Sequence, residues 1–191
     1  MGKNRLEAFS DGVIAIIITI MVLELKVPHG DQLSQLSSTI PVFLGYVMSF
    51  VYVGIYWNNH HHLFHAVRRV NGPILWANLH LLFWLSIVPF VTDWMGQNRA
   101  SAWPVALYGI VLMMAGTAYF ILTQALIAHH GNDSPIALAV GRDIKGKISV
   151  LIYMLAIGLA FVQPWLSIFL YVSVALMWIV PDRRIEKVLE N

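Results

Sequence analysis

The chain has 191 residues, of which 58% are hydrophobic and only 12% are charged. A soluble globular domain carries about 25% charged residues, so this composition excludes an ordinary soluble fold and indicates a protein that lies in a lipid bilayer. There is no cysteine, which leaves no residue for disulfide or thiolate chemistry. The net charge of +2 comes from basic residues that flank apolar runs. We interpret them as determinants of membrane topology and expect no nucleic-acid partner.

The first apolar segment, residues 6–27, is long enough to cross a hydrocarbon core of about 30 Å as a helix. It also carries Ser10, Asp11, Thr19 and Glu24. Polar groups on a spanning helix are costly in lipid and usually face the interior of a bundle or an aqueous path. We therefore expect this helix to have a role beyond that of a lipid-facing anchor.

The branched aliphatic residues of this segment follow a helical spacing. Ile16, Ile20 and Leu23 are four and three positions apart, which places them on one face of a helix, and Thr19 lies on the same face. Ser10 points well away from that face, toward neighbouring helices, and so does Asp11. The pattern fits a helix that presents an aliphatic face to an axis, and it fits equally a core helix with two buried faces.

Five further apolar segments follow, and together with the first they predict six transmembrane helices in one domain that covers residues 1–191. A polar stretch at 129–147 separates the fourth span from the fifth and is expected to contain a short surface helix. The five later spans are predicted at residues 39–66, 73–94, 102–128, 148–162 and 165–180.

An even number of spans places both termini on one side of the membrane. With the termini inside, ten basic residues lie inside and two, Lys26 and Arg99, lie outside, which agrees with the positive-inside rule. The ten are Lys3, Arg5, Arg68, Arg69, Arg142, Lys145, Lys147, Arg183, Arg184 and Lys187. We therefore predict a multi-pass protein with both termini in the cytoplasm.

Two groups of histidines are candidates for polar chemistry. Near the inner end of the second predicted span stand His60, His61, His62 and His65. His61 and His65 are one helical turn apart, as metal ligands on a helix would be, but no glutamate stands between them as in the zinc-protease motif H-E-x-x-H. Both metal binding and interfacial hydrogen bonding stay open, and we favour hydrogen bonding.

In the third span His80 and Trp84 are also one turn apart. A histidine inside the membrane needs a hydrogen-bond partner, and Asp11 or Ser10 is a candidate. We favour a clamp between helices over a proton relay. Asn78 lies on a different face of the same span and is expected to serve another helix contact.

Several chemical functions lack their motifs. The sequence contains no phosphate-binding loop, no nucleophile elbow and no paired-carboxylate motif, so we expect neither an enzyme nor a bound cofactor. The carbonyl potassium filter T-V-G-Y-G is also missing, since Gly45-Tyr46 is followed by Val47.

The first helix resembles a known family. Arg5 is followed after three residues by Phe9-Ser10-Asp11, and residues 12–24 continue as Gly-Val-x-Ala-Ile-x-x-Thr-x-x-x-Leu-Glu. This run is similar to the signature of the transmembrane protein 175 family of potassium channels. Residues 78–86, from Asn78 through Ser86, also look familial, and the six predicted spans match the bacterial form over the whole chain.

The resemblance implies a fold and an assembly. Animal members of the family carry two six-helix repeats and act in endosomes and lysosomes, whereas bacterial members carry one repeat and form tetramers. It therefore implies an all-α homotetramer in the bacterial inner membrane whose first helix lines a central pore.

The resemblance also implies roles for residues. The narrow part of the pore falls on Ile16, Ile20 and Leu23 with Thr19 as polar neighbour, and Ile16 is placed at the narrowest point. The helix is held in place by Arg5, Phe9, Ser10 and Asp11.

We thus expect a potassium-favouring cation channel with a hydrophobic constriction, with self and monovalent cations as partners and potassium as the permeant ion. One alternative is a small proton-coupled transporter that uses Asp11 and His80. Another is a membrane scaffold without transport. The lack of inverted repeats and of broken helices near the midplane counts against the transporter.

Overall fold

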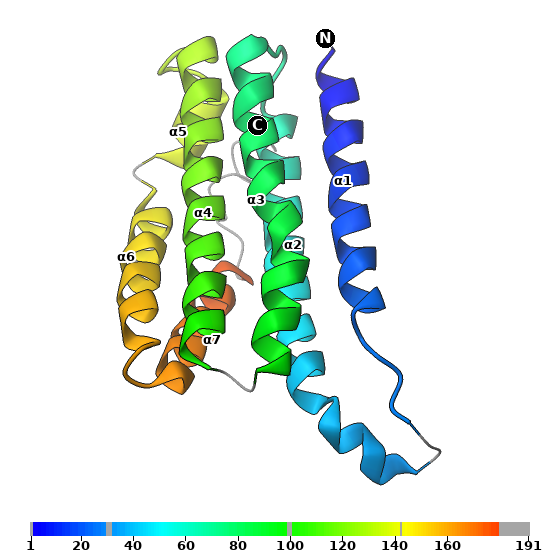
Figure 1. The fold of residues 1–191 in the computed structure, drawn as a ribbon. Helices are drawn as coiled ribbons and strands as arrows, with labels where there is room; N and C mark the ends of the chain where they lie inside the picture. The colour runs from blue at the N-terminus through cyan, green and yellow to red at the C-terminus, as the bar shows by residue number, and fades with distance from the viewer. Residues whose placement is uncertain (1, 30–31, 99–100, 142, 180–191) are drawn as a thin grey trace.

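The computed structural model describes residues 2–29, 32–98, 101–141 and 143–179, and over these ranges every regular element is a helix. Figure 1 shows long helices that run along one common direction, with α1 at one edge of the bundle and α6 at the other. The all-α fold predicted from the sequence is confirmed.

Among the described residues, four long helices are followed by three shorter ones, and a 3-10 helix lies in the connection between the first and the second. In order, the elements are α1 (Lys3–Leu23), the 3-10 helix η1 (Leu33–Ser38), α2 (Ile40–His65), α3 (Gly72–Gln97), α4 (Ala102–His130), α5 (Pro135–Val140), α6 (Ile144–Leu159) and α7 (Pro164–Ile179).

The prediction of six spans is not confirmed by helix length. Among the described residues, four helices, α1 to α4, are long and apolar enough to cross a membrane. Both α6 and α7 have 16 residues, which gives about 24 Å of helix, less than a hydrocarbon core of about 30 Å. In Figure 1 α6 lies beside only the lower part of α4. The first helix is also displaced from the predicted residues 6–27, since it begins at Lys3 and ends before Glu24.

Side chains and glycine mark several helix ends. The Asn71 Oδ1 accepts the backbone N–H of Ile74 at 3.1 Å and so caps α3, and the Asp143 Oδ1 accepts that of Gly146 at 3.1 Å and caps α6. At the end of α4, Gly131 adopts a φ of 91°, which only glycine reaches without strain. The chain then forms α5, which is the short helix predicted within residues 129–147.

The centre of the bundle is formed by α3 and α4. On one side α3 packs against α1 and α2, and on the other α4 packs against α6 and α7. A buried hydroxyl cluster joins three of these helices, because the Ser49 Oγ on α2 lies 2.7 Å from the Thr92 Oγ1 on α3 and 2.9 Å from the Tyr108 hydroxyl on α4.

The backbones of α2 and α3 approach each other closely at Gly96. A Cβ added there would lie 2.8 Å from the Cα of Val42, which is backbone and cannot rotate away. A Cβ at Gly54, also within a helix, would meet no atom within 4 Å.

We therefore predict that Gly96→Ala separates α2 from α3 and lowers the free energy of unfolding by about 1–3 kcal/mol, as overpacking does elsewhere. The midpoint of thermal unfolding in detergent measures the effect. The matched Gly54→Ala should be neutral or slightly stabilising, because alanine is the better helix former. Equal midpoints for the two variants would contradict the close approach.

Candidate functional site: the two faces of the first helix

The two sides of α1 differ in their surroundings. Toward the bundle it buries Leu6, Ser10, Ile14, Ile17 and Met21. The opposite side is exposed over its whole length, and there the relative exposure is 59% for Ile16, 42% for Ile20 and 78% for Leu23. The exposed side also carries Arg5, Phe9, Gly12 and Thr19.

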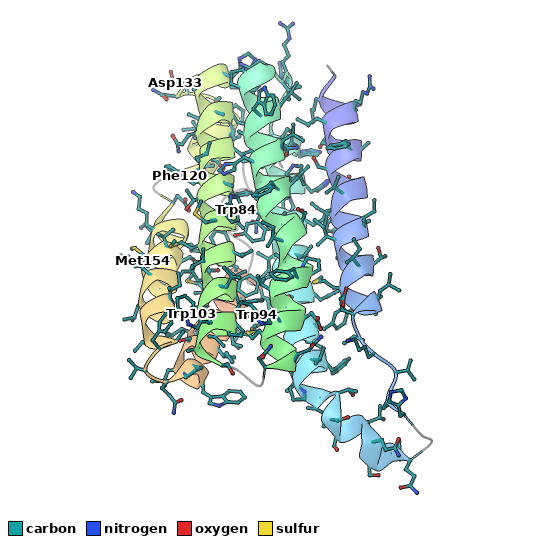
Figure 2. The ribbon with its side chains drawn as sticks, viewed as in Figure 1. Trp84, Trp94, Trp103, Phe120, Asp133 and Met154 are labelled. Atoms are coloured by element: carbon teal, nitrogen blue, oxygen red, sulfur yellow. The ribbon has the colours of Figure 1, made fainter. Side chains whose placement is uncertain are left out.

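Most of these exposed residues form one stripe, and Ile20 borders it, four residues from Ile16 and three from Leu23. Its members Arg5, Phe9, Gly12, Ile16, Thr19 and Leu23 are four and three residues apart in alternation, the spacing of a seam along which helices pack around a common axis. Figure 1 shows α1 at the edge of the bundle, and in Figure 2 its side chains project on the side that is turned away from the other helices. The Thr19 hydroxyl donates to the Ile16 carbonyl at 2.8 Å and is thus partly satisfied within the helix.

The buried face is tied to α2 and α3 by a chain of polar groups. The Nε2–H of His60 donates to the Asn78 Oδ1 at 2.8 Å, and the Asn78 Nδ2 donates to the Ser10 Oγ at 2.9 Å. The Ser10 hydroxyl then donates to the Leu6 carbonyl at 2.9 Å. Each donor has an acceptor, and all three side chains are buried. Such a chain is stable in an apolar medium because no member is left without a partner.

A second polar contact reaches α1 from α2. The indole Nε1 of Trp57 donates to the Asp11 Oδ1 at 3.0 Å, and the Trp57 ring stacks on His61 with centroids 6.2 Å apart. Because Ser10 and Asp11 are adjacent in sequence, their side chains point about 100° apart, and the two contacts hold α1 from two different directions.

The contact predicted between His80 and either Ser10 or Asp11 is wrong. The His80 Nε2 instead accepts the Nε1–H of Trp84 at 3.0 Å within α3, and Asn78 takes the place next to Ser10. The reason is geometric: residues 78 and 80 are about 200° apart around a helix, so only one of them can face α1. Figure 2 shows Trp84 midway along α3.

Arg5 and Phe9, which the resemblance places among the residues that hold the helix, lie on the exposed stripe. Phe9 is 48% exposed, and among the described residues the Arg5 side chain makes no hydrogen bond or ion pair. Within one subunit the positioning contacts are those of Ser10 and Asp11.

The histidines near the end of α2 have separate surroundings. His60 is buried against Phe64, with ring centroids 4.5 Å apart, and is bonded to Asn78. The rings of His61 and His65 lie 6.2 Å apart. In the part of the chain that the structure describes, no three or more His, Cys, Asp or Glu residues are grouped as metal ligands.

Sequence reasoning missed Trp57, the partner of Asp11. It also left open which helix contact Asn78 serves. The available signal was the depth of each residue along its predicted span. Positions 10 and 11 lie early in the first span, position 57 late in the second and position 78 early in the third. Because successive helices run in opposite directions, these positions lie at one level of the bundle.

Comparison with known proteins identifies the family. The family described as the endosomal/lysosomal potassium channel TMEM175 matches residues 5–89. A protein of Chryseobacterium sp. (strain P1-3) named as a potassium channel is 55% identical over 191 residues, which is 100% of both chains. Another from Streptomyces collinus, also named as a potassium channel, is 35% identical over 87% of this chain and 86% of its own.

A solved structure agrees with these relatives. The crystal structure described as a lysosomal potassium-selective channel TMEM175 homolog, from Chamaesiphon minutus, superposes with a TM-score of 0.76 and 26% identity. The superposition covers 94% of this chain and 97% of that one. The chain is therefore a multi-pass membrane protein that belongs to the TMEM175 family of potassium channels.

Proposed function

We propose that this chain is one subunit of a homotetrameric cation channel that favours potassium, with α1 of each subunit lining a central pore. The observation that carries the proposal is the stripe on α1, whose large aliphatic side chains are exposed although the opposite face of the same helix is tightly held. The names of the relatives from Chryseobacterium and Streptomyces support potassium as the ion.

A single helix cannot enclose a pore, so the function requires association. Four copies of α1 around a symmetry axis would cover the stripe, and a closed ring is the usual form of such assemblies. In this proposal the chain is one domain in the bacterial inner membrane, both termini are cytoplasmic, and α6 and α7 complete six spans per subunit although they are short. The basic residues Lys3, Arg5, Arg68 and Arg69 support this orientation.

The proposed mechanism is hydrophobic constriction. Rings of Ile16, Ile20 and Leu23 close the path by dewetting and open it when the helices rotate or separate, without a carbonyl filter. Partial dehydration at such a ring costs less for potassium than for the smaller and more strongly hydrated sodium, which gives modest selectivity. The Thr19 hydroxyl, already bonded to Ile16, offers its lone pairs to a passing cation. No enzyme activity or bound cofactor is part of this proposal.

The proton-coupled transporter is not favoured. It needs Asp11 and His80 to exchange a proton, but Asp11 pairs with Trp57 and His80 with Trp84, in two separate contacts.

We predict that Ile16→Asn, Ile20→Asn and Leu23→Asn each raise passive potassium flux into proteoliposomes and weaken selectivity over sodium, with the largest effect at Ile16. Each change places four amides where the pore must wet, which lowers the barrier. Flux is measured with no imposed proton gradient and matched amounts of folded protein. The wild-type protein should conduct potassium under the same conditions.

The controls are Val22→Asn, at an exposed position outside the stripe, and Val13→Asn or Ile18→Asn, at positions that pack against the core. The last two should disturb folding without creating leak. Wild-type flux and selectivity in all three ring variants would place the gate outside α1.

We predict that the protein purified in lipid nanodiscs has the mass of a tetramer in native mass spectrometry. The sequence contains no cysteine, so a cysteine introduced as Leu23→Cys is the only thiol present. A short bifunctional maleimide should then cross-link this residue between subunits. A monomer or dimer that still conducts potassium would refute the assembly.

We predict that Asn78→Leu lowers the stability of the assembly by about 1–3 kcal/mol, because it leaves the His60 donor unpaired in an apolar setting. The change should appear as a lower midpoint of thermal dissociation. Ser86→Ala on the same helix should be neutral, since among the described residues that hydroxyl bonds only to the Phe83 carbonyl of its own helix. If Ser10→Ala and Asn78→Leu were strictly additive, the polar chain would not act as a unit.

A further inference from the structure

An apolar groove lies between α2 and α7, on the other side of α2 from the packing of α1. Its volume is about 720 Å³, and it runs along α7 from Trp165 to Ile179. The walls are aliphatic: α2 contributes Leu44, Met48 and Val51, and α7 contributes Ile168, Val172 and Leu176. The groove is open along its side, and Leu176 is 60% exposed.

The groove changes polarity along its length. At the end near η1 the lining includes Ser37, Ser38 and the indole of Trp165, whereas the remainder is apolar, and none of the described lining residues is charged. The two serine hydroxyls donate to the carbonyls of Ser34 and Gln35, at 2.7 and 2.8 Å, and keep lone pairs free to accept hydrogen bonds. An exposed tryptophan at a helix end is typical of the level of lipid headgroups.

We propose that this groove binds one acyl chain of a phospholipid, with the glycerol and headgroup at the Ser37–Ser38 end. The occupant must be amphiphilic because the groove is polar at one end only, and the surrounding bilayer supplies such molecules. The C-terminal segment of the chain itself is a poor fit, because six of the twelve residues at positions 180–191 are Asp, Glu, Lys or Arg. Burial of these charges in an apolar groove would be strongly unfavourable.

A bound acyl chain would also support the short helix α7 on the side that faces α2. Buried tyrosine contacts, such as the Tyr171 hydroxyl on the Val105 carbonyl at 3.1 Å, hold α7 against α4. On the side of α2 the groove leaves α7 without a continuous packing partner, and lipid fills that space.

The test measures the number of phospholipid molecules that each subunit retains, so its outcome does not depend on ion conduction. The protein is reconstituted in nanodiscs of palmitoyl-oleoyl phosphatidylethanolamine and phosphatidylglycerol, extracted in mild detergent, and examined by native mass spectrometry. We expect about one retained phospholipid per subunit. Val172→Trp should fill the groove and lower retention about tenfold, which corresponds to 1.4 kcal/mol. The matched Leu155→Trp, at a position of α6 that is 58% exposed outside the groove, should leave retention unchanged.

A second measurement needs no groove-filling variant. Leu176→Cys labelled with benzophenone maleimide and irradiated in the same nanodiscs should form phospholipid adducts. Cross-linking to another subunit would overturn the proposal, because the groove would then be a protein interface. Equal loss of lipid in Val172→Trp and Leu155→Trp, or no loss in either, would also overturn it.

Discussion

The rotation of α1 about its own axis depends on the polar chain that runs from the Leu6 carbonyl through Ser10 and Asn78 to His60. Ser10 meets Asn78 in only one orientation of the helix. The contact between Asp11 and Trp57 constrains the same rotation from a second direction. Together they determine which residues of α1 are turned away from the bundle, and the stripe from Arg5 to Leu23 follows from that choice.

Polar contacts are needed to determine the rotation of α1, because the surrounding lipid scarcely favours one orientation over another. Hydrocarbon tails are as apolar as the side chains of isoleucine or leucine, so burial of one aliphatic face in place of another is nearly neutral. Hydrogen bonds between helices contribute only about 0.6–2 kcal/mol each, yet they discriminate between orientations that packing alone leaves similar. The mean hydropathy of the chain, +0.69, shows how few polar groups are available for this discrimination.

Three adjacent residues in the signature motif thus have three different surroundings. Phe9 lies on the exposed stripe, Ser10 is fully buried, and Asp11 is exposed but bonded to α2. Consecutive helical residues point about 100° apart, so a short motif can specify an orientation. If α1 lines a pore, as we propose, the same motif separates the surface that ions meet from the surface that holds the helix. Asp11 accepts a hydrogen bond from Trp57 and His80 accepts one from Trp84, so these two titratable groups belong to different contacts.

The sequence by itself determined the all-α membrane fold, the four long helices to within a few residues and the aliphatic face of the first helix. These features follow from the composition of the chain and from the helical spacing of its apolar residues, both of which can be read without the structure. It did not determine the partners of the polar residues, because His80 and Asn78 are equally suitable hydrogen-bonding groups until the rotation of α3 is known. Only the tertiary structure selected Asn78 for Ser10 and brought Trp57, distant in sequence, to Asp11. It also revealed that α6 and α7 are shorter than α1 to α4 and that a groove lies between α2 and α7, since helix length and lateral packing depend on where neighbouring helices stop.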